Sequence, residues 1–291
     1  MRVVGSLTTI PGREKKLFKT LLSLKNQDYK LDEIYLNIPK YSKRLNKKYP
    51  KLSKKILKLV KIVKLKQDYG PICKILGALI MEKNKDTIIM TFDDDIIYDK
   101  TLVSKMIQYH IKFPNEALGS SGSFIAFRIP FYNSIINNKP NVNLILGLNI
   151  PEEGRYIDCL WGVSSVLYVR KFFKNYNDLI KYPLENENIF FNDDLMISGY
   201  LEKNNIKRRI VKNSPYYGRN KYKDDNFSIS YSRINFIIRY EKAIEELRKE
   251  GFFKHIEHID IINTLFGKIF MIVMVILIFI FIFLIFYYKL L

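Results

Sequence analysis

Three consecutive aspartates form the stretch of this sequence that most clearly suggests chemistry. Asp93, Asp94 and Asp95 lie in TFDDDIIYD, directly after the apolar run TIIMTF at residues 87–92. Alternate residues of an extended chain point the same way, so Asp93 and Asp95 can converge, with Asp94 a bystander or a hydrogen-bond partner. Two carboxylates can hold Mg²⁺ or Mn²⁺ against substrate phosphates, and the cation stabilises the charge of a phosphate-bearing leaving group. The alternative is a turn that caps a helix near residue 100.

A second acidic pair, Asp193 and Asp194, lies in FFNDDLMISGYL. Carboxylates at a helix start are favoured by the helix dipole, and this alone would explain the pair. A carboxylate held there could also act as a general base that takes a proton from an attacking hydroxyl. The two interpretations are compatible, because a base must be fixed in direction.

The stretch DYGPICKILGAL at residues 68–79 could bind an anion. Gly70 permits close backbone approach, Pro71 is suited to the first position of a helix, and helix N-termini favour anions. Lys74 lies one turn inside this helix and could reach a phosphate. The alternative is an ordinary strand-to-helix turn.

These residues are placed by alternating strand and helix patterns, which favour an open α/β sheet. We predict strands at 3–9, 33–38, 59–65 and 87–92 and helices at 14–25, 52–58 and 71–81. Ligands bind such sheets outside the carboxyl ends of the strands, which is where the aspartate triplet lies.

After residue 115 the pattern is less regular. In order, we expect a small-residue strand or turn at 118–127, a loop at 133–154, a strand at 163–169 that continues through 173, a helix at 192–205, a strand at 207–211, a polar stretch at 215–228 and an amphipathic helix at 234–250.

The composition is that of a globular protein, with 291 residues, 48% hydrophobic and 26% charged. The net charge is +19, and the run from Lys40 to Lys66 holds twelve Lys or Arg and no acid. This run could contact an anionic membrane or ligand, or it could be a solvated surface of a lysine-rich chain. We expect no nucleic-acid partner, because no recognised motif accompanies the run. Two cysteines indicate a reducing compartment.

An uncharged apolar segment occupies residues 269–288, IFMIVMVILIFIFIFLIFYY. Twenty helical residues cover the ~30 Å hydrocarbon layer of a bilayer, and a buried core helix is the alternative. With no signal-peptide pattern at the start, we expect a single-pass tail anchor that leaves the rest of the chain cytosolic. The expected domains are a catalytic domain at 1–232, an amphipathic helix and linker at 233–265, and a transmembrane anchor at 266–291.

Six stretches together resemble GT-A-type glycosyltransferases, most closely the family-two-like enzymes and their relatives in large DNA viruses. The resemblance covers roughly residues 3–211. The stretches, in order, are SLTTIPGRE (6–14), EIYLNIP (33–39), QDYGPICKILGAL (67–79), IIMTFDDDIIY (88–98), GVSSVLYVRKFF (162–173) and FFNDDLMISGYL (190–201).

The resemblance implies a Rossmann-like nucleotide-sugar fold, with a mostly parallel sheet flanked by helices and a D-x-D metal site at Asp93 and Asp95. It places donor-binding residues at Thr8, Arg13, Asp68, Lys74, Asp93 and Asp94. It makes Asp194 the catalytic base, with Asp193 as the alternative.

On the acceptor side the chain departs from the family. Ser164-Ser165 follows Trp161 and Gly162, where the family usually has a Gly-Gly pair. Trp161, the only tryptophan, could stack on a sugar ring of the acceptor or be a buried core aromatic.

We therefore expect a glycosyltransferase, hexosyltransferase-like, that uses Mn²⁺ or Mg²⁺. It would move a sugar from a nucleotide diphosphate sugar to an acceptor hydroxyl of a carbohydrate, protein or lipid, with inversion. The alternatives are a nucleotidyltransferase of similar fold and a non-catalytic tail-anchored interaction protein.

Overall fold

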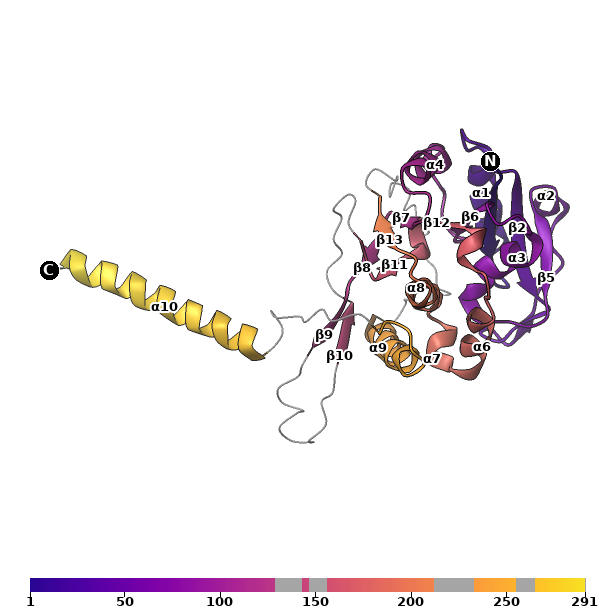
Figure 1. Cartoon of the computed structure of the whole chain (residues 1–291). Helices are drawn as coiled ribbons and strands as arrows, with labels where there is room; N and C mark the ends of the chain where they lie inside the picture. Colours follow the sequence, from indigo (N-terminus) through magenta and orange to yellow (C-terminus); the bar gives the residue numbers. More distant parts are fainter. Residues whose placement is uncertain (129–142, 147–155, 212–232, 255–264, 291) are drawn as a thin grey trace. The chain divides into compact units, whose positions relative to one another are not determined.

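The computed structural model describes residues 1–128, 143–146, 156–211, 233–254 and 265–290 (Figure 1). The chain divides into two compact units. The first comprises residues 1–124 and 148–254, and the second comprises residues 125–147 and 255–291. The predicted domain boundaries at 232 and 265 stay predictions.

A seven-stranded sheet forms the centre of the first unit, with strand order β13-β7-β12-β6-β1-β2-β5. Neighbouring strands are parallel except around β12, which runs antiparallel to both β6 and β7. This confirms a mostly parallel sheet in an α/β fold. The strands are β1 (Val3–Thr8), β2 (Glu33–Pro39), β5 (Lys61–Leu65), β6 (Ile88–Phe92), β7 (Ala117–Gly119), β12 (Val166–Val169) and β13 (Arg208–Ile210).

Alternation of side chains along the strands divides the apolar core between two faces of this sheet. On one face, Val3 and Leu7 of β1 belong to a buried cluster with three helices: α1 (Glu14–Lys25), α2 (Lys54–Leu57) and α4 (Leu102–Lys112). On the other face, α3 (Cys73–Met81) packs across β1 and β2. The apolar run of β6 is buried throughout, because helices cover both of its faces.

Buried hydrogen bonds fix the start of α3 against β1 and β2. The carbonyl of Lys74 accepts from Ser6 Oγ at 2.6 Å and from Asn37 Nδ2 at 3.0 Å. Helix and strand approach so closely that a Cβ at Gly77 would lie 1.7 Å from Asn37 Oδ1. A glycine is required there, and the first turn of α3, with its lysine, is held rigidly over the strand ends. Residues Gly70–Ile72, before α3, form a short 3-10 helix, η1, that contains Pro71.

The second half of the first unit differs from the sequence-based expectation in several places. The strand predicted to continue through 173 ends at Val169, and Arg170–Phe172 form a 3-10 helix, η3. Where the strand ends, the guanidinium of Arg170 donates to the carbonyls of Glu82 and Phe173. The helix predicted at 52–58 is shorter, Lys54–Leu57, because Ser53 caps it. The following elements were not predicted: the hairpin of β3 (Tyr41–Ser42) with β4 (Lys47–Lys48), the strand β11 (Cys159–Leu160), which pairs antiparallel with β8 (Gly122–Ser123), and the helices α6 (Asp178–Glu185) and α7 (Glu187–Phe190).

Two predicted helices complete the first unit. Helix α8 (Asp193–Lys203) begins at the second acidic pair, and α9 (Arg233–Lys249) packs on α7 and α8. Its residues Tyr240, Ala243, Ile244 and Leu247 are buried. The amphipathic pattern of α9 thus reflects packing onto the body of this unit.

The second unit contains the antiparallel pair β9 (Ile125–Arg128) and β10 (Asn143–Leu146) and the helix α10 (Leu265–Leu290). Within the described residues, no helix is long and apolar enough to cross a membrane. Most of the loop predicted at 133–154, the polar stretch at 215–228 and many side chains of the proposed anchor lie outside the described residues.

Candidate active site

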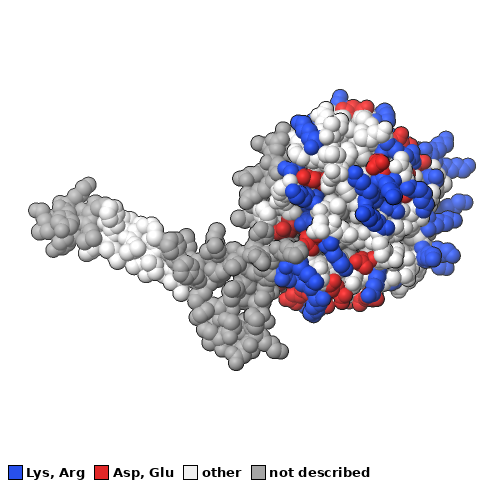
Figure 2. Space-filling view, viewed as in Figure 1, with Lys and Arg blue, Asp and Glu red and all other residues white. Residues whose placement is uncertain are grey.

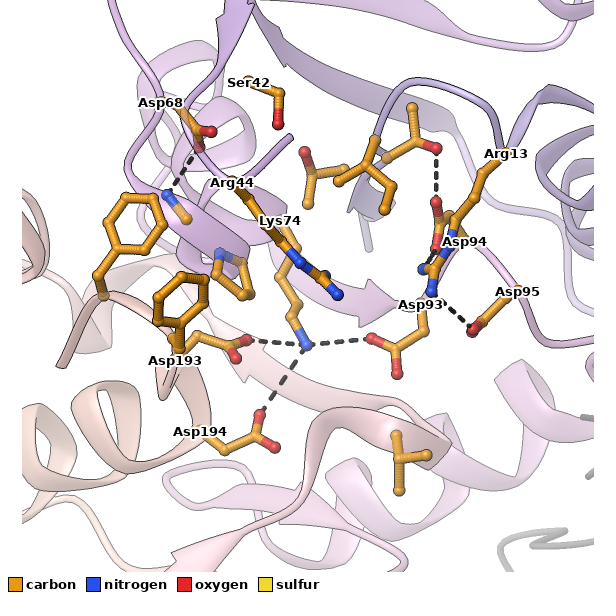
Figure 3. A pocket seen from close by; sticks show the side chains of 18 of the residues that line it. Arg13, Ser42, Arg44, Asp68, Lys74, Asp93, Asp94, Asp95, Asp193 and Asp194 are labelled. Carbon is orange, nitrogen blue, oxygen red and sulfur yellow. Dashed lines mark hydrogen bonds and ion pairs between the residues drawn. The ribbon is translucent and has the colours of Figure 1, made fainter. Parts of the chain in front are cut away.

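A pocket of about 260 Å³ opens where β1 and β6 end, entirely within the first unit (Figure 3). That volume is near the lower end of the ~300–1,000 Å³ typical of ligand sites. The pocket is lined by residues in or next to these elements: β1, β6, the β3–β4 hairpin, the start of α3, the start of α8, and α9. Its polar lining consists of Thr8, Thr9, Arg13, Ser42, Arg44, Tyr49, Asp68, Lys74, Asp93, Asp94, Asp95, Asp193, Asp194 and Tyr240.

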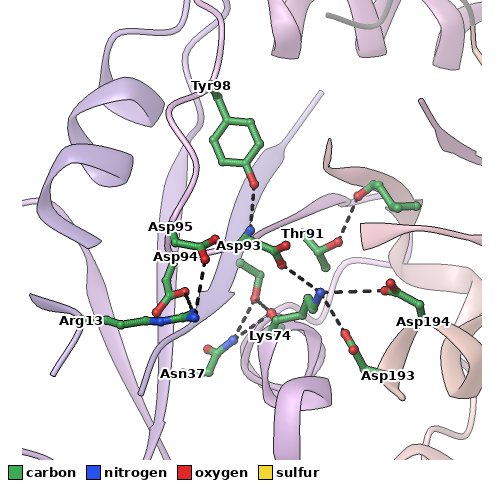
Figure 4. A network of polar contacts seen from close by, with 12 residues as sticks. Arg13, Asn37, Lys74, Thr91, Asp93, Asp94, Asp95, Tyr98, Asp193 and Asp194 are labelled. Carbon is green, nitrogen blue, oxygen red and sulfur yellow. Dashed lines mark hydrogen bonds and ion pairs between the residues drawn. The ribbon is translucent and has the colours of Figure 1, made fainter. Parts of the chain in front are cut away.

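Lys74 joins the two acidic motifs. Its Nζ lies 3.1 Å from Oδ1 of Asp93, which follows β6. From the opposite wall, the start of α8, Asp193 Oδ2 lies 2.9 Å from Nζ and Asp194 Oδ1 lies 3.9 Å away (Figure 4). Burial acts to lower the pKa of Lys74, but the charges of these three carboxylates outweigh it and raise the pKa well above its usual range. One ammonium ion therefore links carboxylates that are a hundred residues apart in the sequence.

Asp94 is the most buried member of the triplet. Its side chain is buried and accepts from Arg13 Nη1 at 2.7 Å and from the Thr9 hydroxyl. Thr20 Oγ1 donates to its backbone carbonyl at 3.1 Å. Burial raises the pKa of Asp94, although Arg13 and Thr9 oppose this shift. Asp94 thus fixes the loop after β6, and Arg13 is a partner of the triplet.

Asp93 and Asp95, the predicted metal pair, each lie near a basic side chain. Asp93 extends toward Lys74, whereas Asp95 extends toward Arg13, whose Nη2 lies 3.6 Å from Asp95 Oδ2 (Figure 4). Both carboxylates line the pocket and keep part of their surface exposed, 27% for Asp93 and 20% for Asp95. The described residues contain no group of three or more His, Cys, Asp or Glu placed to hold a metal.

The charges lining the pocket nevertheless suit a divalent cation. Among the described residues, six aspartates but only three basic side chains face it. Mg²⁺ is commonly held by one or two carboxylates with substrate phosphates and water, so two protein ligands suffice. Asp93 and Asp95 fit such a donor set.

Asp194 lies under the turn that contains Gly162. A Cβ at Gly162 would lie 2.7 Å from both Asp194 Oδ1 and Lys74 Nζ. Burial and the neighbouring charge of Asp193 raise the pKa of Asp194 to about 8, with Lys74 acting in the opposite direction. A carboxyl with such a pKa can exchange a proton near neutral pH, as a general base must. Gly162, placed on the acceptor side from the sequence, thus lies next to the predicted base, between the pocket-lining residues Trp161 and Val163.

Thr8 and Asp68, which the resemblance assigns to donor binding, also form hydrogen bonds with backbone groups. Asp68 accepts from the amides of Lys43 and Gly70, both at 2.8 Å, and so ties the β3–β4 hairpin to η1. Thr8 Oγ1 donates to the carbonyl of Asn37 at 2.7 Å. Both residues line the pocket, so these bonds orient the side chains at its rim.

Trp161 forms part of an aromatic wall. Its ring lies 5.3 Å from that of Tyr240 on α9, and its Nε1 donates to Ser123 Oγ at 2.9 Å. Trp161 keeps partial exposure in the pocket. Phe190 and Phe191 line the same pocket. The indole therefore presents an apolar surface to a ligand while its polar atom is satisfied.

Sequence reasoning missed several of these residues. Arg44 reaches into the pocket from the β3–β4 hairpin, which is too short to give a strand pattern (Figure 3). Tyr240 belongs to the amphipathic helix that was expected to lie outside the catalytic domain. Arg44 lies in the sequence between the stretches 6–14 and 67–79, which contain donor-binding residues, and this position could have indicated a role in the site. The many lysines around Arg44 hid that indication.

No protein-family model and no curated protein match this chain. Among solved structures it is similar to S. aureus TarS 1-349 in complex with UDP, with 13% identity and a TM-score of 0.46 over 73% of this chain and 58% of that chain. For the complex with UDP-GlcNAc, the TM-score is again 0.46, with 13% identity and 73% and 56% of the two chains covered. The match thus spans less than two thirds of that protein. A similarity of this degree does not extend to the activity or ligands of this chain.

Proposed function

We propose that this chain is a metal-dependent glycosyltransferase that transfers a sugar from a nucleotide diphosphate sugar to an acceptor hydroxyl. The observation that carries the proposal is the meeting of Asp93 and Asp194 on Lys74 in one pocket. A glycosyl transfer needs charge stabilisation at the leaving phosphate and a base at the incoming hydroxyl. The pocket supplies candidates for both on opposite walls.

On the donor side, Asp93 and Asp95 would hold Mn²⁺ or Mg²⁺. The cation would supply the positive charge that a diphosphate needs in a pocket with more carboxylates than basic groups. Arg13, Arg44 and Lys74 lie within the same lining and would bind phosphate oxygens directly. Thr8 and Asp68, at the rim, would orient the nucleotide.

On the acceptor side, Asp194 would take the proton from the attacking hydroxyl at its Oδ atoms. Asp193 remains the alternative base, because its carboxylate lines the same pocket. Lys74 would hold whichever carboxylate acts at a fixed place relative to the donor carboxylate Asp93. Trp161 would stack on a ring of the acceptor. A hydroxyl attacking from the side opposite the diphosphate inverts the anomeric carbon.

A screen of nucleotide sugars for hydrolysis and transfer by the full-length chain tests this function. We expect release of nucleoside diphosphate with Mn²⁺ or Mg²⁺, its loss in EDTA, and a loss of at least about a hundredfold in Asp95→Asn and Asp194→Asn. Asp86→Asn is the matched control, since Asp86 is an exposed acid outside the pocket. Full activity of Asp95→Asn in EDTA would remove the metal mechanism.

The same screen separates the two rival functions. A nucleotidyltransferase would attack phosphorus and release pyrophosphate in place of nucleoside diphosphate. A non-catalytic interaction protein would bind no nucleotide sugar and would tolerate Asp194→Asn in its cellular role.

We further propose that residues 266–291 anchor the chain in a membrane, with the catalytic domain on the cytosolic side. The support is the uncharged apolar sequence at 269–288, flanked by Lys268 and Lys289. Alkaline extraction of membranes from cells that express the full chain, or a chain ending at 265, would test the anchor. An anchored chain stays in the pellet only when 266–291 are present.

A further inference from the structure

We propose that the first unit carries a docking surface for an anionic lipid bilayer, formed by lysines that do not line the pocket. This surface, here called the basic edge, consists of the β3–β4 hairpin, helix α2 and the edge strand β5. It gathers the following exposed lysines: Lys47, Lys48, Lys51, Lys54, Lys55, Lys58, Lys61, Lys64 and Lys66. Figure 2 shows Lys and Arg gathered on the rim of the molecule where Figure 1 places α2 and β5.

The basic edge concentrates charge that the fold leaves unneutralised. The run from Lys40 to Lys66 supplies twelve of the positive charges behind the net +19 and contains no acid. Elsewhere in the described residues exposed lysines do form ion pairs, for example Lys203 with Asp178 at 3.2 Å. No lysine of the basic edge has a carboxylate partner within the described part of the chain. The nine ammonium groups of the basic edge therefore produce a field that extends about a Debye length, ~8–10 Å, into solution.

The apolar residues of the basic edge favour a lipid surface over other polyanions. Leu57 is 45% exposed at the end of α2, next to Lys54 and Lys58, and Tyr41 is 40% exposed on the hairpin. Protein segments that lie in a membrane interface combine basic residues, which contact phosphate headgroups, with apolar residues, which enter the bilayer surface. The lysines, the leucine and the tyrosine of the basic edge are such a combination. An extended nucleic-acid backbone would satisfy the lysines but would leave Leu57 in water.

Docking through the basic edge would also orient the pocket. The hairpin that carries Lys47 and Lys48 contributes Ser42, Arg44 and Tyr49 to the pocket lining. A bilayer in contact with the outer side of the hairpin would thus lie close to the pocket rim.

The test uses the full-length chain with an environment-sensitive dye on Leu57→Cys, and Lys55→Cys provides a second labelling position. Cys73 and Cys159 are buried, so the introduced thiol is labelled selectively. The control position is Ile111→Cys, 68% exposed on α4. Because the dye reports on its own surroundings, attachment through another part of the chain gives no signal at position 57. Vesicles are phosphatidylcholine with or without phosphatidylserine.

We expect a blue shift at position 57, but not at 111, only with phosphatidylserine, and its reversal in about 1 M NaCl, where the Debye length is ~3 Å. Lys54→Glu with Lys58→Glu should weaken the response at least about tenfold. Lys83→Glu with Lys85→Glu, two exposed lysines outside the basic edge, should leave it unchanged.

Three results would overturn the proposal. One is an equal response at positions 57 and 111. Another is an equal loss of the dye response in the Lys54/Lys58 and the Lys83/Lys85 charge-reversal variants, which would show that only the net charge of the protein matters. The third is salt-sensitive binding of RNA or DNA that depends on Lys54 and Lys58 without any vesicle response, which would assign the basic edge to nucleic acid.

Discussion

The Nζ atom of Lys74 lies 2.9 Å from Oδ2 of Asp193, and the two side chains are only 8% and 10% exposed. Removing one partner of a buried ion pair leaves an uncompensated charge and costs about 3–5 kcal/mol. Lys74 is also the contact of Asp93 and Asp194, so its loss would leave three carboxylates close together.

We therefore expect Lys74→Met to lower the free energy of unfolding by about 3 kcal/mol near pH 8. The penalty should shrink on acidification, because Asp194, whose pKa is raised, can then take up a proton. Thermal unfolding at several pH values measures this, with the exposed Lys83→Met as the control. A penalty independent of pH would show that packing of the lysine stem, and not its charge, matters.

The raised pKa of Asp194 predicts an alkaline rise in activity. If Asp194 is the base, it works only when ionised, so kcat/KM should increase with pH and level off above about 8. Rates of nucleoside diphosphate release across this range provide the profile. Asp193→Asn should move the midpoint to lower pH, because the charge of Asp193 helps to raise the pKa of Asp194. A profile already flat at pH 6 would exclude Asp194 as the base.

The same shift predicts how stability depends on pH. The native pKa of Asp194 is higher than the unfolded value, so the folded state binds more protons between about pH 4 and 8. Its contribution to stability is fully present below the unfolded pKa and is lost as pH rises through about 8. Asp194→Asn should flatten this part of the stability curve, measured by thermal unfolding. A wild-type curve that rises over this range, and is unchanged by the substitution, would contradict the assignment.

Gly162→Ala should damage activity more than stability. The added methyl group would lie 2.7 Å from Asp194 Oδ1 and Lys74 Nζ, both at the ends of movable side chains, so the fold can accommodate it by displacing them. Displacing a base by about 1 Å can cost about a hundredfold in rate. Steady-state rates and melting temperatures, measured together, check this. Unaltered kcat would show that this approach is not needed for catalysis.

Ser165 holds a backbone conformation that favours glycine, with φ 80° and ψ 142°. A non-glycine residue in such a region costs about 1–3 kcal/mol. Ser165→Gly should therefore raise the free energy of unfolding by about 1 kcal/mol, after the entropy that glycine loses on folding. Ser165 Oγ is also buried, and no described residue forms a hydrogen bond with it. Ser165→Ala removes the hydroxyl but keeps the strained backbone. If Ser165→Ala and Ser165→Gly stabilise the protein equally, the gain comes from removing the hydroxyl and not from relieving the strain.

The conformation of Ser165 also explains the departure from the family pattern. The resemblance predicts glycine at position 165, where this chain has serine. The backbone of Ser165 nevertheless has the positive φ that favours glycine. The turn after Gly162 is therefore imposed by its surroundings, including the bond from Ser165 N to Gly162 O at 3.0 Å. A local pattern could not have revealed this strain.

Elements with strong periodicity or long apolar runs were predictable from the sequence. Strands β1, β2 and β6 and helices α1, α3, α8 and α9 lie within a few residues of the predicted ranges. Short elements such as β3, β4 and β11 escaped prediction, because two residues carry too little pattern. The antiparallel direction of β12 was also not predictable, since direction depends on the path of the connecting chain.

The sequence by itself determined the types of chemistry available: two acidic motifs, a lysine between them and an apolar run ahead of the first. This was possible because apolar periodicity and charge are properties of a short stretch of sequence, whichever other segment packs against it. Only the tertiary structure decided which charges meet. It directed Asp93 toward Lys74 and Asp95 toward Arg13, and it brought the start of α8 to the same ammonium. Such contacts depend on packing between distant segments, as where Asn37 and Ser6 fix the start of α3.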